Sequence, residues 1–99
     1  MFGLPETTIQ SVINIFKTYA KVEKVILFGS RALGNYKPGS DIDLAIIGNN
    51  ITFDDILNLH IQIETLELPY QVDLVNFQTV EDENVLNHIK RAGTVFYEK

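Results

Sequence analysis

The chain has 99 residues, 45% of them hydrophobic, no cysteine and a formal net charge of -5. This length supports one hydrophobic core, so we expect a single domain over residues 1–99 and exclude intrinsic disorder, a disulfide framework and a thiolate metal site. The acidic balance argues against broad nucleic-acid binding, and the chain shows neither a signal peptide nor a run of roughly 20 apolar residues, so we expect a cytoplasmic protein without a membrane span.

Helical spacing opens the chain, because apolar residues recur on one face of the first segment. Pro5 suits the first turn of this helix, where its missing N–H carries no penalty. The expected apolar face consists of Ile9, Val12, Ile13, Phe16, Tyr19 and Ala20.

Branched and apolar residues 24–28 predict a buried strand that ends at Gly29 and Ser30. Residues 30–34 are long enough for one helical turn before a glycine stops it. The turn-forming residues 35–40 then predict a loop.

Residues 41–47 alternate in character and predict a second strand. Side chains alternate between the two faces of a strand, so Asp41 and Asp43 point to the same side. Ala45 shares their face, and Ile42, Leu44 and Ile46 share the other.

A helix is predicted from Thr52, because Asp55 three residues later resembles a capping box and Ile51 can pack against Ile56. One helical face is formed by Phe53, Ile56, Leu57, His60 and Ile63. We interpret its apolar residues as core unless an exposed patch proves to be a partner interface, and His60 as a packed or partly buried histidine. The acidic residues Asp54, Asp55, Glu64 and Glu67 are interpreted as a solvated face.

Residues 71–77 predict a third strand that carries Asp73. Thr79 is the expected cap of a last helix, with acidic residues 81–83 in its first turn and His88 on its surface. Residues 94–97 predict a short final strand. The expected fold class is therefore α/β (α+β), a small mixed sheet flanked by helices.

Asp41 and Asp43 are the strongest candidate site residues. Two carboxylates on one face of a strand repel each other unless a cation lies between them. Mg²⁺ accepts one or two carboxylates together with substrate phosphates. If the strand of Asp73 neighbours theirs, three carboxylates can hold two ions for phosphoryl transfer.

Gly29 and Ser30 supply a second element, because a glycine turn exposes backbone N–H groups that can hold a phosphate. Ser30 adds a hydroxyl donor. Arg31 and Ser40 are further candidate nucleotide contacts. Arg31 is equally compatible with ordinary surface charge, and the better reading of Ser40 is that it shapes the turn. We expect Asp73 to orient or deprotonate an acceptor hydroxyl.

Gly29-Ser30, ten intervening residues and then Asp41-x-Asp43 resemble the signature of the DNA polymerase β-type nucleotidyltransferases, in particular the minimal, MntA-like antitoxin group. The resemblance implies that Asp41, Asp43 and Asp73 bind one or two Mg²⁺ ions and are catalytic. It implies that Gly29 and Ser30 contact the nucleotide, with ATP as the substrate.

The same resemblance implies a partner, a HEPN-domain toxin that receives AMP on a tyrosine, so that this chain acts as its antitoxin. Two alternatives stay open. The chain could bind a nucleotide or a partner without turnover, or it could modify a small molecule such as an aminoglycoside. The base preference, the acceptor atom and any homo-oligomer are not determined by the sequence.

Overall fold

The structure is a computed structural model that describes residues 1–99. Its centre is a four-stranded sheet with the strand order β3-β2-β1-β4. The strands are β1 (Val22–Phe28), β2 (Ile42–Gly48), β3 (Val72–Asn76) and β4 (Thr94–Glu98). β1 pairs antiparallel with β2 and β4, whereas β2 and β3 are parallel, so the predicted mixed sheet is confirmed.

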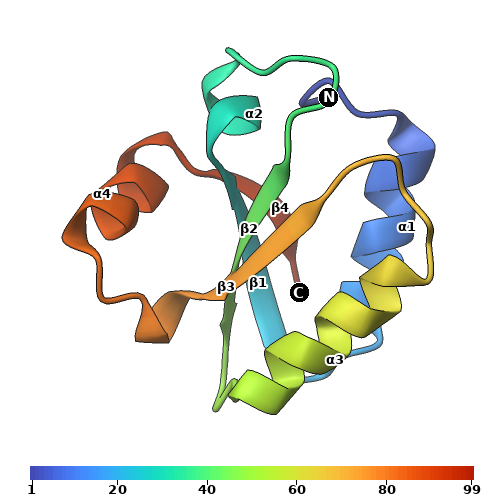
Figure 1. Ribbon diagram of the computed structural model, residues 1–99. Helices are drawn as coiled ribbons and strands as arrows, with labels where there is room; N and C mark the ends of the chain where they lie inside the picture. The colour runs from blue at the N-terminus through green and yellow to red at the C-terminus, as the bar shows by residue number, and fades with distance from the viewer.

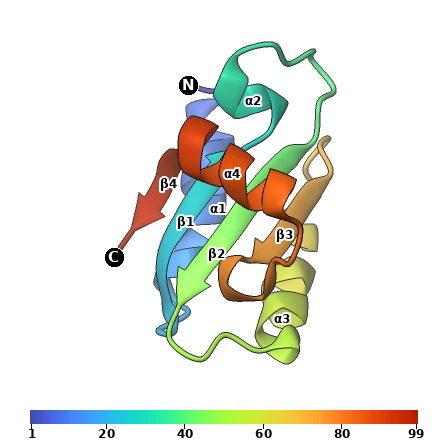
Figure 2. The same ribbon diagram turned by 90° about the vertical axis from the view of Figure 1, so that its left-hand side faces the viewer.

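Helices cover the sheet on both faces. They are α1 (Glu6–Lys17), α2 (Ser30–Leu33), α3 (Phe53–Glu64) and α4 (Glu83–Ala92), with a 3₁₀ turn at Phe77–Thr79. Figure 1 shows the sheet almost edge-on, with α1 and α3 on one side and α4 on the other. In Figure 2, α4 crosses in front of the sheet while α2 lies above the end of β1. The fold is therefore layered, and α4 alone crosses one face.

The hydrophobic core lies between the sheet and the layer of α1 and α3. Phe16 of α1, Leu44 of β2 and Leu59 of α3 are each 0% exposed. Fully burying a side chain of this size contributes about 1.5–3 kcal/mol relative to leaving it in water. Because Leu44 faces this layer, its neighbour Asp43 faces the side of α4.

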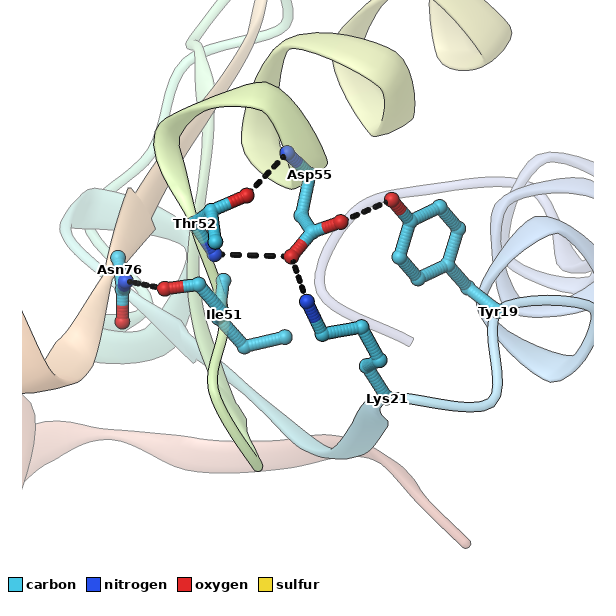
Figure 3. A network of polar contacts seen from close by, with 6 residues as sticks. All are labelled: Tyr19, Lys21, Ile51, Thr52, Asp55 and Asn76. Carbon is cyan, nitrogen blue, oxygen red and sulfur yellow. Dashed lines mark hydrogen bonds and ion pairs between the residues drawn. The ribbon is translucent and has the colours of Figure 1, made fainter.

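α3 begins where the sequence predicts, because Thr52 and Asp55 form a capping box. Figure 3 shows that the Asp55 carboxylate also accepts hydrogen bonds from the Tyr19 hydroxyl and from Lys21 Nζ. Asp55 is only 8% exposed, so the expectation that it lies on a solvated face is wrong. Its carboxylate ties α3 to the segment between α1 and β1.

The burial of Asp55 rotates α3 relative to the expected face. Leu59 and Ile63 are buried beside it. Phe53 is 80% exposed and Leu57 45% exposed, so the interpretation of these two residues as core is wrong. The hydrogen bonds of Asp55 to Tyr19 and Lys21 lie on the side of α3 that packs inward.

Two helix boundaries also differ from expectation. α1 begins directly after Pro5 and ends at Lys17, so Tyr19 lies beyond it, where its hydroxyl reaches Asp55. α4 is capped by Asp82, whose carboxylate accepts from two backbone N–H groups, and not by Thr79. No helix of the structure combines the length and the apolar character needed to cross a membrane.

Candidate active site

The candidate site lies where three strand ends meet. β1 runs antiparallel to β2, so the end of β1 lies beside the start of β2, with Phe28 opposite Asp43. β3 runs parallel to β2, so its start lies at the same edge, with Asp73 directly opposite Asp43. Directly opposed residues of neighbouring strands project to the same face. The expectation that Asp73 shares a face with Asp43 is therefore confirmed.

Gly29 packs directly against the Asp43 carboxylate. Its φ is +78°, and a Cβ atom placed on it would lie 2.3 Å from Asp43 Oδ2. Both the left-handed conformation and this close approach require glycine. The structure therefore brings the glycine turn and the aspartates together, as the spacing predicts.

The charges of the site are not balanced by the chain itself. Burial raises the pKa of Asp43 above its ordinary value, and the negative charges of Asp73 and Asp41 raise it further. The positive charge that His88 carries only when protonated lowers the pKa of Asp43, and it is the smallest of these influences. The only hydrogen bond to any of the three carboxylates is a long one, 3.4 Å from Gln71 Nε2 to Asp73 Oδ1. The site therefore has a deficit of positive charge and of donors.

The three carboxylates do not form a compact cluster of three metal ligands. Asp41 is exposed and precedes β2, whereas Asp43 and Asp73 are half-buried on the strands. Mutual repulsion keeps uncompensated carboxylates apart, and a divalent cation removes that repulsion. The donor set fits Mg²⁺, because the carboxylate oxygens are hard ligands whose negative charge the chain leaves uncompensated.

Arg31 is built into the fold. It is 2% exposed, and its guanidinium donates to the Ser40 carbonyl and the Phe2 carbonyl. Its guanidinium carbon also lies 5.0 Å from the ring centroid of Tyr70. Arg31 is therefore not an ordinary surface charge, and its contact with nucleotide stays a prediction.

Ser30 and Ser40 differ in how they are held. Ser30 is the first residue of α2 and is half-buried beside Gly29. The Ser40 hydroxyl accepts from the backbone N–H of Lys37 at 2.7 Å, so Ser40 shapes the turn as expected. Contact of either serine with nucleotide stays a prediction.

His88 is the site residue that the sequence analysis missed. It is half-buried rather than a surface residue, and its Nε2 accepts a hydrogen bond from the Gly29 N–H at 2.8 Å. Its ring also packs edge-on against Phe28, with centroids 6.1 Å apart. One signal existed, since His88 lies three residues after Val85 and next to Ile89 on the inward side of α4.

Two apolar hollows lie between α3 and β3. Their volumes are about 400 Å³ and 590 Å³, and both are lined by Phe53 and Ile56 of α3 and by Leu74 of β3. The smaller hollow also reaches Asp73. Gly29, Ser30, Asp41 and Asp43 line neither hollow.

Comparison with known proteins identifies the family. Residues 10–99 match the family described as "Polymerase beta, Nucleotidyltransferase". A protein of Methanocaldococcus jannaschii, named "Putative protein adenylyltransferase", is 37% identical over 84 residues, which are 83% of this chain and 78% of that protein. The chain belongs to the polymerase β-type nucleotidyltransferase family.

Solved structures of toxin–antitoxin complexes share the fold of this nucleotidyltransferase. One complex, determined with AMP-PNP, contains a chain that matches with a TM-score of 0.72 at 21% identity, over 97% of this chain and 75% of that chain. Another joins an MNT antitoxin to a tri-AMPylated HEPN toxin of Shewanella oneidensis, with a TM-score of 0.70 at 17% identity, over 95% of this chain and 72% of that chain. The expected polymerase β-like fold is confirmed, and a chain of a solved MntA–HepT complex shares it.

Proposed function

We propose that this nucleotidyltransferase transfers AMP from ATP to a hydroxyl group of a partner protein in a Mg²⁺-dependent reaction. One observation supports the proposal most directly. Asp43 lies in register with Asp73 and against Gly29, so the carboxylates and the glycine turn lie together at one end of the strands. A nucleoside triphosphate with its cations matches both features, because it brings positive charge to the carboxylates and phosphate oxygens to the turn.

In the proposed reaction, Asp41, Asp43 and Asp73 hold one or two Mg²⁺ ions, which when bound offset the negative charge that develops on the phosphates. The backbone N–H and hydroxyl of Ser30 hold the triphosphate, and Gly29 lets the backbone approach it closely. The acceptor oxygen bonds to the α-phosphorus, and the bond between that phosphorus and the bridging oxygen breaks. Pyrophosphate leaves, and Asp73 accepts or orients the acceptor proton.

The acceptor that we propose is a tyrosine of a helical HEPN toxin, which AMP transfer would silence. Support comes from the exposed side chains of Phe53, Leu57 and Ile61, which are 80%, 45% and 54% exposed and recur every four residues along α3. Such a stripe on one helix face is typical of a protein interface. Phe53 and Leu57 line the hollow that reaches Asp73, so a protein bound to the stripe would lie beside that part of the candidate site.

The decisive experiment incubates the chain with [α-³²P]ATP, Mg²⁺ and a HEPN-domain toxin as the partner. Wild type is expected to label the partner, and Asp43→Asn and Asp73→Asn are expected not to. A partner variant with the acceptor tyrosine changed to phenylalanine serves as the matched control for the site of transfer.

A second candidate function is a binding module without turnover. The apolar stripe favours it, because partner binding there needs no carboxylates. Tight partner binding without label transfer would support this candidate and overturn the first. Labelling of a small molecule alone would instead identify a transferase for small substrates.

A further inference from the structure

We propose that His88 is a positioning residue that holds the nucleotide-binding turn in its working conformation, an inference that rests on the proposed function. His88 comes from α4, 59 residues further along the chain than Gly29. Its role is to accept the Gly29 N–H and so fix the peptide that begins the turn. The same contact makes α4 part of the site.

The first support is the hydrogen bond itself. Gly29 N and His88 Nε2 are 2.8 Å apart, a normal distance for an N–H donor. An imidazole nitrogen accepts a hydrogen bond only when it carries no proton, so the neutral ring has its proton on Nδ1. The bond therefore defines both the direction of the Gly29 N–H and the tautomer of His88.

The second support is the confinement of Gly29 on its other side. Asp43 Oδ2 leaves no room for a side chain there, and φ is +78°. Gly29 is thus held between a carboxylate and an imidazole, while the Phe28 ring orients that imidazole edge-on. Without the acceptor, a glycine in this region has several accessible conformations, because it lacks the steric restriction of a Cβ.

The consequence concerns the nucleotide. The Gly29 conformation determines where the following N–H groups and the Ser30 hydroxyl point, since Ser30 directly follows it. A turn already fixed in the binding conformation loses less conformational entropy when a triphosphate binds. Removal of the His88 acceptor therefore weakens nucleotide affinity, although His88 lies on a different element.

Three variants distinguish the role of His88 as a hydrogen-bond acceptor from its role in side-chain packing. His88→Gln keeps an oxygen acceptor near the position of Nε2, whereas His88→Leu keeps bulk without an acceptor. Asn87→Leu is the matched control, because Asn87 is the exposed neighbour of His88 on α4. Affinity for Mg²⁺ and AMP-PNP is measured by calorimetry, and amide hydrogen exchange of Gly29 is measured by NMR in the absence of nucleotide.

We expect His88→Leu to weaken AMP-PNP binding about tenfold, the effect of one lost hydrogen bond, and to accelerate Gly29 exchange. His88→Gln and Asn87→Leu should stay close to wild type in both readouts. The positioning role is overturned if His88→Leu binds as wild type does, if it binds more tightly because His88 competes with phosphate, or if His88→Gln is as weak as His88→Leu. If wild type binds no AMP-PNP, the proposed function fails and the positioning role with it, and the exchange rates then still report whether the bond to Gly29 forms.

Discussion

Asp55 and Asp43 differ in how the protein compensates their negative charge, and their pKa values shift in opposite directions. The Asp55 carboxylate accepts hydrogen bonds from Lys21, Tyr19 and the Thr52 N–H, and these bonds hold its pKa well below the usual range. Asp43 has its pKa raised by burial and by two further carboxylates. The chain satisfies the structural carboxylate completely and leaves the other one for a ligand. Perturbed titratable groups of the second kind are typical of functional sites.

The largest expected effect is a loss of AMP transfer when Asp43, but not Asp55, is changed to asparagine. Asp43→Asn should reduce label transfer about a thousandfold or more, the order of loss when a charge-stabilising group of an active site is removed. Asp55→Asn, the same chemical change, should leave transfer per folded molecule near wild type. Initial rates with labelled ATP and partner, normalised to folded protein by circular dichroism, measure both. Equal losses in the two variants would contradict the distinction.

The apolar stripe of α3 is predicted to bind the partner without the help of Asp43 or Asp55. Phe53→Ser should weaken partner binding by about 2 kcal/mol if Phe53 is an anchoring side chain of the interface. Nucleotide binding should not change, and stability should change little because Phe53 is 80% exposed. Calorimetry with the partner and with AMP-PNP checks the two affinities. A variant that binds the partner as tightly as wild type would remove the stripe from the interface.

Stability should move in opposite directions at the two aspartates. In buffer with a chelator at pH 7, Asp43→Asn should raise the free energy of unfolding by on the order of 1 kcal/mol, because it removes an unsatisfied charge at a functional site. Asp55→Asn should lower that free energy, because the ion pair with Lys21 is lost. Urea unfolding curves measure both changes. A stabilising Asp55→Asn would show that the network of Figure 3 does not stabilise the fold.

A smaller effect is expected at the cap itself. Thr52→Ala removes the side-chain oxygen that accepts from the Asp55 N–H at 3.2 Å. The typical cost of losing such a cap is about 1 kcal/mol. Urea unfolding is again the measurement. Thr7→Ala, at an exposed position of α1, is the control for the loss of a threonine.

The pH dependence of Asp55 gives the smallest effect. Its folded pKa is depressed, so its contribution to stability is fully present above the unfolded pKa of about 3.9 and is lost progressively as the pH falls from that value through the lower folded pKa. The difference in unfolding free energy between wild type and Asp55→Asn should therefore be constant near neutral pH and shrink in acid. A difference that grows in acid would have the wrong sign for a depressed pKa.

Local patterns are enough to single out Asp41, Asp43 and the turn at Gly29 as candidate site residues. Alternation predicts both aspartates on one strand face, whereas in the structure Asp41 precedes β2 and only Asp43 lies on the strand. The neighbourhood of Asp73 needed the pairing of β2 with β3, which no local pattern contains. The sequence could predict only that Asp73 joins the site if its strand neighbours that of Asp43, and the observed register of β2 and β3 meets this condition.

The failures came from contacts between distant segments. His88 was expected at the surface, because nothing near it in the sequence reveals Gly29, which lies 59 residues away. Asp55 and Phe53 exchanged their expected environments, because Tyr19 and Lys21 draw Asp55 inward. The expectation for α3 assumed that its charged residues face solvent, and the buried Asp55 breaks that assumption.

The most direct test of the metal site titrates Mn²⁺ with AMP-PNP into ¹⁵N-labelled protein and follows paramagnetic broadening of backbone amides. Broadening should begin at residues 29, 30, 43 and 73, spare the surroundings of Asp55, and largely disappear in Asp43→Asn. Broadening centred on the acidic segment 81–83, or a pattern unchanged by Asp43→Asn, would contradict a metal site at the meeting point of the three strands.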